Sequence, residues 1–123
     1  MKVKHHKELI VWQKSMQLAK MIYILTSKFP TEEKYGFCSQ MQGCSVAIPS
    51  DIAEGAKRSY TREYIQMLSK ANGSAAELET QLLLSQEIYS YLKIDEEFEA
   101  CLALTDEVLK MLYRLIESLN SDL

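Results

Sequence analysis

Residues 61–91 carry an apolar or small side chain at every third or fourth position and contain no proline. Alternating steps of three and four residues place such side chains along one side of an α-helix, as in helical bundles and coiled coils. The pattern therefore predicts one long helix in this part of the chain. The positions expected to be buried are Tyr64, Leu68, Ala71, Ala75, Leu78, Leu82, Ser85, Tyr89 and Leu92.

Three other segments, residues 8–28, 32–54 and 96–119, show the same helical periodicity. The first ends before Phe29-Pro30, because a residue that precedes proline avoids the helical conformation. Thr31 and Asp95 are the expected N-terminal caps of the other two helices, and Pro49 is expected to kink the second. The second and fourth helices are expected to bury Cys38, Met41, Ser45, Ile48 and Ile52, and Phe98, Cys101, Thr105, Val108, Leu112, Leu115 and Leu119.

The turns between these helices are short, and the whole chain holds only four glycines and two prolines. Consecutive helices joined by short turns pack antiparallel. The chain has 123 residues and can bury a core without metal or disulfide support. The sequence therefore predicts an all-α protein with one domain over residues 1–123, an antiparallel up-down-up-down four-helix bundle, preceded by a flexible basic tail at residues 1–7.

Helix 8–28 carries two apolar rows, which lie about 100° apart around the helix axis. One hydrophobic seam needs a single row, so we expect this helix to be covered on both flanks, either within the bundle or by another subunit. Trp12, Leu18 and Ile22 are the candidate residues of an oligomer interface. One row consists of Leu9, Trp12, Met16, Ala19 and Tyr23, and the other of Val11, Leu18, Ile22, Leu25 and Phe29.

Gly55 is predicted to end the second helix in the left-handed conformation, which glycine adopts without a Cβ penalty. Glu54 then lies at the negative end of the helix dipole, where an acid is disfavoured. A residue kept at such a position is expected to have a partner, and the candidates are Arg58 and Arg62, just across the turn.

Small residues fill the middle of the 61–91 helix, from Ala71 to Ala76. Gly73 costs a helix interior about 1 kcal/mol relative to alanine, which indicates the close approach of another helix. Glu77 follows and is either exposed or paired with a basic residue of a neighbour. Beside the seam of the second helix, a stripe of small and polar groups is either a solvent-facing flank or the lining of an intersubunit contact or central opening: Gln40, Cys44, Ala47, Asp51 and Glu54.

Side chains suited to catalysis are few. His5 and His6 are the only histidines and stand in the expected tail, either solvated or as a metal clip. The chain has no Glu-x-x-His pair, no phosphate-binding glycine loop and no nucleophile with a histidine–carboxylate partner. The sequence therefore predicts a protein that is not an enzyme and holds no metal or cofactor.

The cysteines and the apolar runs indicate the compartment. Cys38, Cys44 and Cys101 match no zinc-ligand spacing and are interpreted as small buried hydrophobic residues in a reducing environment. No run approaches the ~18 consecutive apolar residues that a membrane span needs. We therefore expect a cytoplasmic protein without a membrane partner.

Charge is divided unevenly along the chain. Residues 1–72 hold 11 Lys and Arg against 6 Asp and Glu, whereas residues 73–123 hold 3 against 11, within a net charge of −3. Such polarity permits nucleic-acid contact through one end, and it equally permits packing between unlike surfaces of neighbouring copies.

The basic residues at the start of the 61–91 helix, Lys57, Arg58, Arg62 and Lys70, are candidates for nucleic-acid binding. Tyr60 lies among them, and an aromatic ring beside guanidinium groups can stack on bases while the cations hold phosphates. The alternatives are a solvated basic helix start and pairing with the acidic half of another subunit.

Several segments, in this order, carry a family resemblance: Leu9–Met16, Phe29-Pro30 with Glu33 and Tyr35-Gly36, Ser39–Met41, Ile52–Gly55 and Gly73–Glu79. Together they resemble the four-helix-bundle proteins encoded by intervening sequences in bacterial 23S rRNA genes. That family is similar to the accessory variability determinant of diversity-generating retroelements. The resemblance extends from Leu9 to about Leu92.

The resemblance implies a bundle that assembles into a barrel-like homopentamer, with no known enzymatic activity. It implies structural roles for Glu54, Gly55, Arg58, Gly73 and Glu77. In the retroelement relatives it implies binding to a reverse transcriptase and to nucleic acid. The resulting hypothesis is a non-enzymatic, oligomeric binding protein with an RNA or ribonucleoprotein partner. The alternative is a protein-binding adaptor or accessory factor, for example for a reverse transcriptase, that uses its acidic C-terminal half and does not bind nucleic acid directly.

Overall fold

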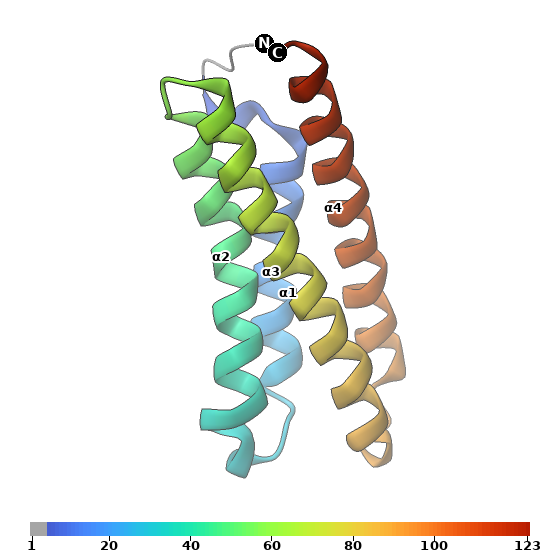
Figure 1. The fold of residues 1–123 in the computed structure, drawn as a ribbon. Helices are drawn as coiled ribbons and strands as arrows, with labels where there is room; N and C mark the ends of the chain where they lie inside the picture. Colours follow the sequence, from blue (N-terminus) through green and yellow to red (C-terminus); the bar gives the residue numbers. More distant parts are fainter. Residues whose placement is uncertain (1–4) are drawn as a thin grey trace.

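The computed structural model describes residues 5–123 and shows four long helices packed side by side (Figure 1). α1 spans Ile10–Thr26, α2 Ser39–Ala56, α3 Thr61–Ile88 and α4 Asp95–Ser121. Each helix contacts the next along the chain, and α1 also contacts α4, which closes the bundle. Consecutive helices run antiparallel, so the predicted all-α, up-down-up-down four-helix bundle is confirmed.

The core is built from the predicted seams of α2, α3 and α4 together with the Leu18 row of α1. Every α3 position expected to be buried is buried from Tyr64 to Tyr89, while Leu92 is half-buried, as is Leu115 in α4. Burying a Leu, Ile, Phe or Met side chain stabilises a fold by about 1.5–3 kcal/mol, so these seams supply most of the stability. The largest fully buried side chains are Phe98, Leu18, Ile22, Leu25, Met41, Ile48, Ile52, Leu68, Leu78, Leu82, Leu112 and Leu119.

The start of the second helix differs from the prediction. Thr31–Glu33 forms a 3-10 turn, and Lys34–Cys38 forms a π-helical turn before α2 begins at Ser39. Thr31 is therefore not an N-cap, since Pro30 holds that position and no side chain caps the turn. The Glu33 carboxylate instead accepts a hydrogen bond from the Phe37 amide at 3.4 Å, which satisfies one of the free N–H groups at the helix start.

The start of α4 differs from the prediction by one residue. Ile94 is its N-cap, and Asp95 is the first helical residue rather than the cap. Asp95, Glu96 and Glu97 occupy the first turn, where the positive end of the helix dipole favours acids. The one left-handed non-glycine residue of the described chain is Lys93, with φ 59°, in the turn between α3 and α4.

Gly55 has a different role from the one predicted. It does not have a positive φ, and α2 continues past it to Ala56. A Cβ at this position would lie 2.8 Å from the Met67 Cβ and 3.0 Å from the Tyr64 Cδ1. Glycine is needed here because α3 packs directly against the end of α2.

Gly73 does not mark a close helix approach. It is exposed, and a Cβ there would have no neighbour within 4 Å. The small residues that face the core are Ala71 and Ala75, both fully buried to either side of it. The predicted burial of Ala71 and Ala75 in the seam is confirmed, and the predicted close helix approach at Gly73 is wrong.

The cysteines are free thiols, of which Cys38 and Cys101 are buried and Cys44 is half-buried. Burial raises the pKa of the Cys101 thiol to about 11, so this thiol stays protonated at neutral pH. The interpretation of Cys38 and Cys101 as buried hydrophobic residues is confirmed.

The N-terminal segment is described from His5 onward, and residues 1–4 of the predicted tail lie outside the described residues. His6–Glu8 form a 3-10 turn against the start of α1. The side-chain amide of Gln13 donates a hydrogen bond to the Lys7 carbonyl at 2.8 Å. The His6 and Trp12 rings meet edge to face, with their centroids 5.2 Å apart. The described end of this segment is thus packed on the bundle.

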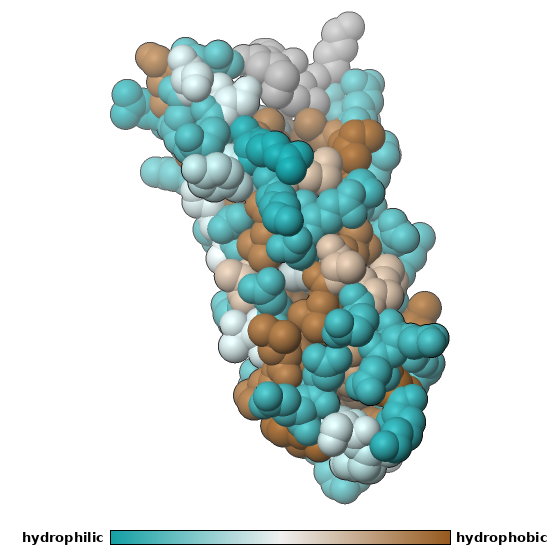
Figure 2. All heavy atoms as spheres, turned by 90° about the vertical axis from the view of Figure 1, so that its right-hand side faces the viewer, coloured by the Kyte–Doolittle hydropathy of each residue, from teal (hydrophilic) through white to brown (hydrophobic). Residues whose placement is uncertain are grey.

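Polar and charged side chains cover much of the α4 side of the molecule (Figure 2). Apolar side chains show between them, chiefly toward the end of the bundle where α3 meets α4.

Candidate functional site

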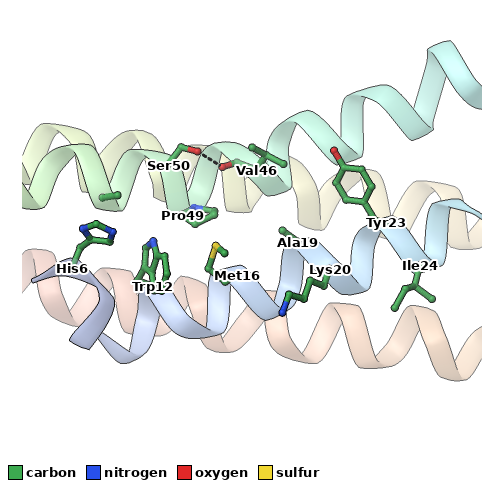
Figure 3. Close-up of a pocket in the computed structure, with 11 residues that line it drawn as sticks. His6, Trp12, Met16, Ala19, Lys20, Tyr23, Ile24, Val46, Pro49 and Ser50 are labelled. Carbon is green, nitrogen blue, oxygen red and sulfur yellow. Dashed lines mark hydrogen bonds between the residues drawn. The ribbon is translucent and has the colours of Figure 1, made fainter.

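An open apolar groove with a volume of about 760 Å³ runs between α1 and α2 (Figure 3). Met16, Tyr23 and Ile24 on its α1 side expose 38%, 49% and 60% of their surface, and Val46 on its α2 side exposes 44%. Several large apolar side chains therefore share one surface without a covering element from the described chain.

Few polar groups line this groove. The Ser50 hydroxyl is used within α2, since it donates a hydrogen bond to the Val46 carbonyl at 2.8 Å (Figure 3). The charged or titratable nitrogen groups of the lining are His6 and Lys20, and Lys20 has no ion-pair partner within residues 5–123. The groove thus offers apolar surface with one cation, Lys20, at its edge, and no cluster of polar groups that could orient a small ligand.

The two apolar rows of α1 lie in different environments, one in the core and the other along the groove. The row that contains Leu18 and Ile22 points into the core, and both side chains are 0% exposed. The prediction of these two residues at an oligomer interface was therefore wrong, because their own bundle covers them completely. Trp12 belongs to the other row; it is half-buried and lines the groove together with Met16 and Tyr23.

Small side chains explain why the groove is hollow. Ala19 on α1 and Ala53 on α2 line it, and neither extends far enough to fill the space between the helices. Pro49 lies on the same side of α2 and has no amide to bond back to the Ser45 carbonyl. The small and polar stripe that the sequence offered as a possible contact, from Gln40 to Glu54, does not line the groove. The α2 residues that do line it come one residue earlier in the sequence than Ala47, Asp51 and Glu54. The α2 wall of the groove could have been predicted from Val46, Pro49 and Ala53, which follow one another by three and four residues and lie outside the core seam.

The predicted basic residues are all exposed, near the end of α2 and along the first turns of α3. Arg58 forms an ion pair with Glu54, so one of the two predicted partners is confirmed, as a contact four residues along the chain. Lys70 lies near Asp51: burial raises the pKa of Asp51, and the charge of Lys70 opposes that rise. Lys57 and Arg62 have no ion-pair partner in the described part of the chain.

The N-terminal turn adds to this basic end of the bundle. The pKa of His6 is lowered first by burial and then by the positive charges of His5, Lys57 and Lys7. Lys57 is therefore close enough to the end of the groove for its charge to act on His6. The structure brings Lys57 toward the groove and leaves Lys70 farther along α3, so the four basic residues do not form one compact cluster.

The model of the 23S rRNA-intervening sequence protein family matches residues 7–114. The chain belongs to this family. A comparison with curated proteins found none that matches.

The matched range contains both walls of the groove and all four basic residues of this family member. It also contains Glu77, which is exposed and accepts a weak hydrogen bond from the Cys44 thiol, with Sγ and Oε2 3.7 Å apart. Burial raises the pKa of the Cys44 thiol, and the charge of Glu77 raises it further. Glu77 therefore has a partner in its own chain, and that partner is not basic.

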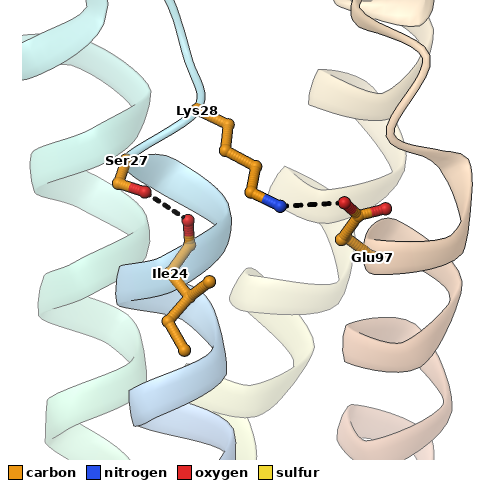
Figure 4. Close-up of polar contacts among 4 residues, drawn as sticks. All are labelled: Ile24, Ser27, Lys28 and Glu97. Atoms are coloured by element: carbon orange, nitrogen blue, oxygen red, sulfur yellow. Dashed lines mark hydrogen bonds and ion pairs between the residues drawn. The ribbon is translucent and has the colours of Figure 1, made fainter.

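Part of the uneven charge distribution is neutralised by partly exposed ion pairs between helices of the same chain. Lys28 beyond α1 pairs with Glu97 on α4 at 2.8 Å (Figure 4), and Lys14 on α1 pairs with Glu107 at 2.7 Å. The basic and acidic halves of this family member thus meet where α1 packs beside α4.

The described residues show neither a metal site nor a membrane-spanning helix. Across residues 5–123, no three His, Cys, Asp or Glu side chains come together in a way that could hold a metal ion. In the same range, every helix is too short or too polar to cross a bilayer.

Proposed function

We propose that the protein is a non-enzymatic binding protein that works as a homo-oligomer, and that the α1–α2 groove is its contact with another copy. The observation that carries this proposal is the groove itself, whose large apolar residues expose between 38% and 60% of their surface. Contiguous exposed apolar patches mark protein contact sites, because water contact with such surface is unfavourable.

The lining favours a polypeptide over a small molecule as the occupant. Small-molecule sites combine apolar walls with a few convergent polar groups that fix the orientation of the ligand. In this groove the Ser50 hydroxyl is already satisfied. The other polar groups, on His6, Trp12, Lys20 and Tyr23, are spread along the N-terminal turn and α1 and do not converge on one point. An apolar helix surface with a complementary charge fits these features better.

The assembly is tested by measuring molar mass with light scattering and native mass spectrometry. The wild-type protein is expected to be a multimer at micromolar concentration, and the resemblance to barrel-like pentamers makes five the expected number of copies. Met16→Glu places a carboxylate in the groove and is expected to give a monomer. Tyr113→Glu, at a side chain that is 63% exposed on α4 outside the groove, is the matched control and should leave the mass unchanged. A monomeric wild type refutes the proposal.

RNA association is the second candidate, and it is favoured by the exposed cations Lys57 and Arg62, which have no ion-pair partner in residues 5–123. An assembly repeats this pair in every copy, so weak phosphate contacts add up. The family is named for an intervening sequence of 23S rRNA, which makes RNA fragments from that gene a reasonable probe.

This candidate is tested by titrating labelled 23S rRNA fragments at two salt concentrations. Removing one cation that binds a phosphate should reduce the slope of log affinity against log salt by about 0.7–0.9. Lys57→Ala and Arg62→Ala are therefore expected to weaken binding and flatten the salt dependence. Lys110→Ala on α4, an exposed lysine paired with Asp106 at 2.9 Å, is the control. Absence of binding at low salt favours the protein-binding adaptor instead.

A further inference from the structure

A second exposed apolar surface lies near the end of α3. Leu83, Leu84 and Ile88 expose 50%, 48% and 48% of their surface and are called the α3 patch here. Leu84 also borders a shallow hollow between α2 and α3 that Phe37 and Gly36 help to line. The α3 patch and the groove share no residue, so each molecule has two separate apolar surfaces.

The two surfaces carry opposite charges. The positive charge of the groove is that of Lys20, because the lowered pKa of His6 leaves its imidazole neutral at pH 7. Glu87 follows Leu83 and Leu84 by one helical turn and lies between them on the helix surface. Glu33 is the charged residue that lines the hollow beside Leu84. Neither Lys20 nor Glu87 has an ion-pair partner within the described chain, so both are available to a neighbouring molecule.

The dimensions are compatible as well. At a rise of about 1.5 Å per residue, the groove wall from Trp12 to Tyr23 is about 16 Å long, and the stretch from Leu83 to Ile88 is about 7.5 Å long. A helix that presents apolar side chains along one side can lie in such a groove, and Lys20 sits within its length.

We propose that the α3 patch of one copy docks in the α1–α2 groove of the next copy, with Glu87 placed against Lys20. This inference rests on the proposed self-association and specifies which surfaces meet. A contact of one groove with another groove leaves the α3 patch in water and brings like charges together. A head-to-tail contact covers both apolar surfaces on every molecule and pairs unlike charges. Contacts between two different surfaces generate rings when the rotation closes.

Complementation between two defective variants tests this arrangement. The groove variant carries Met16→Glu and Val46→Glu, and the patch variant carries Leu84→Glu and Ile88→Glu. All four side chains are at least 38% exposed, so the bundle should fold, which circular dichroism and thermal unfolding will verify. Each variant alone is expected to be monomeric. An equimolar mixture is expected to form a one-to-one heterodimer and nothing larger, because only one intact groove and one intact patch remain.

The outcomes separate this inference from the function on which it rests. If the patch variant keeps the wild-type mass while the groove variant is monomeric, the head-to-tail contact is wrong and self-association through the groove stands. If the wild-type protein is itself a monomer, both proposals fail. Charge reversal gives a second test: Lys20→Glu and Glu87→Lys should each weaken assembly, and the two together in one chain should restore it. Failure to restore assembly overturns the placement of Glu87 against Lys20.

Discussion

Replacing Gly55 with alanine should destabilise the bundle, although alanine is the better helix former. The added Cβ would meet the Met67 Cβ at 2.8 Å and the Tyr64 Cδ1 at 3.0 Å. The Met67 Cβ is fixed to the α3 backbone and cannot rotate away, so α2 and α3 must separate locally. Overpacking of this kind costs about 1–3 kcal/mol. The higher helix propensity of alanine offsets less than about 1 kcal/mol of this cost, because Gly55 lies in the last turn of α2. We expect a net destabilisation of about 1–2 kcal/mol.

The same helix provides the control. Gly43 lies inside α2, and a Cβ there would have no neighbour within 4 Å. Gly43→Ala should therefore stabilise the protein by about 1 kcal/mol, which makes the difference between the two variants about 2–3 kcal/mol. Urea unfolding followed by circular dichroism measures this difference. All variants must be compared at one protein concentration, since association of folded copies adds to apparent stability. If Gly55→Ala unfolds at the same urea concentration as Gly43→Ala or a higher one, the close packing of α2 on α3 at Gly55 is wrong.

Three further outcomes are expected. Burial raises the pKa of the Cys101 thiol from 9.0 to about 11. The contribution of this thiol to the free energy of unfolding is therefore fully present below pH 9 and lost as pH rises toward 11. Cys101→Ala should flatten the dependence of the free energy of unfolding on pH in this range. The hydrogen bond from Lys28 lowers the pKa of Glu97, so its contribution is present above pH 4.5 and lost as pH falls below that value; Glu97→Gln should reduce the acid sensitivity of unfolding. Trp12 is the single tryptophan and lines the groove, so diluting the wild-type protein should shift its fluorescence to longer wavelength as copies separate, and a spectrum independent of concentration contradicts a covered groove.

Helical periodicity predicted the fold well because bundle helices bury one side, and a three-four spacing reports that side directly. The seam positions of α3 from Tyr64 to Tyr89 were found for this reason. Helix starts were predicted less accurately. The segment around Gly36, with φ −107° and ψ −112°, interrupts the helix without any break in apolar spacing. Glycine roles also depend on a neighbouring element: Gly55 contacts α3, whereas Gly73 faces open space.

The site could be predicted only in part from the sequence. The two apolar rows on α1 predicted more apolar surface than one core seam needs, and the structure leaves the Met16 row outside the core, so its cover by another subunit stays a prediction. Periodicity gives the angle between rows, but it cannot tell which row faces inward, and so Leu18 and Ile22 were taken for interface residues. The inward row is decided by packing: the Leu18 row is buried in the core shared by the four helices, while the Met16 row faces the hollow beside α2.

The uneven charge of the chain links these surfaces. Lys14 and Lys28 are neutralised by acids of α4, so the surplus of positive charge in the first half does not all reach the outside. Lys20 lies on α1 between these two lysines in the sequence and has no such partner within residues 5–123. It borders the groove between α1 and α2. In the proposed head-to-tail contact, the acid opposite Lys20 is Glu87 of the next copy, which is exposed among apolar side chains. Unlike charges meet within one chain between α1 and α4, and in the proposed assembly they meet a second time between copies across the groove.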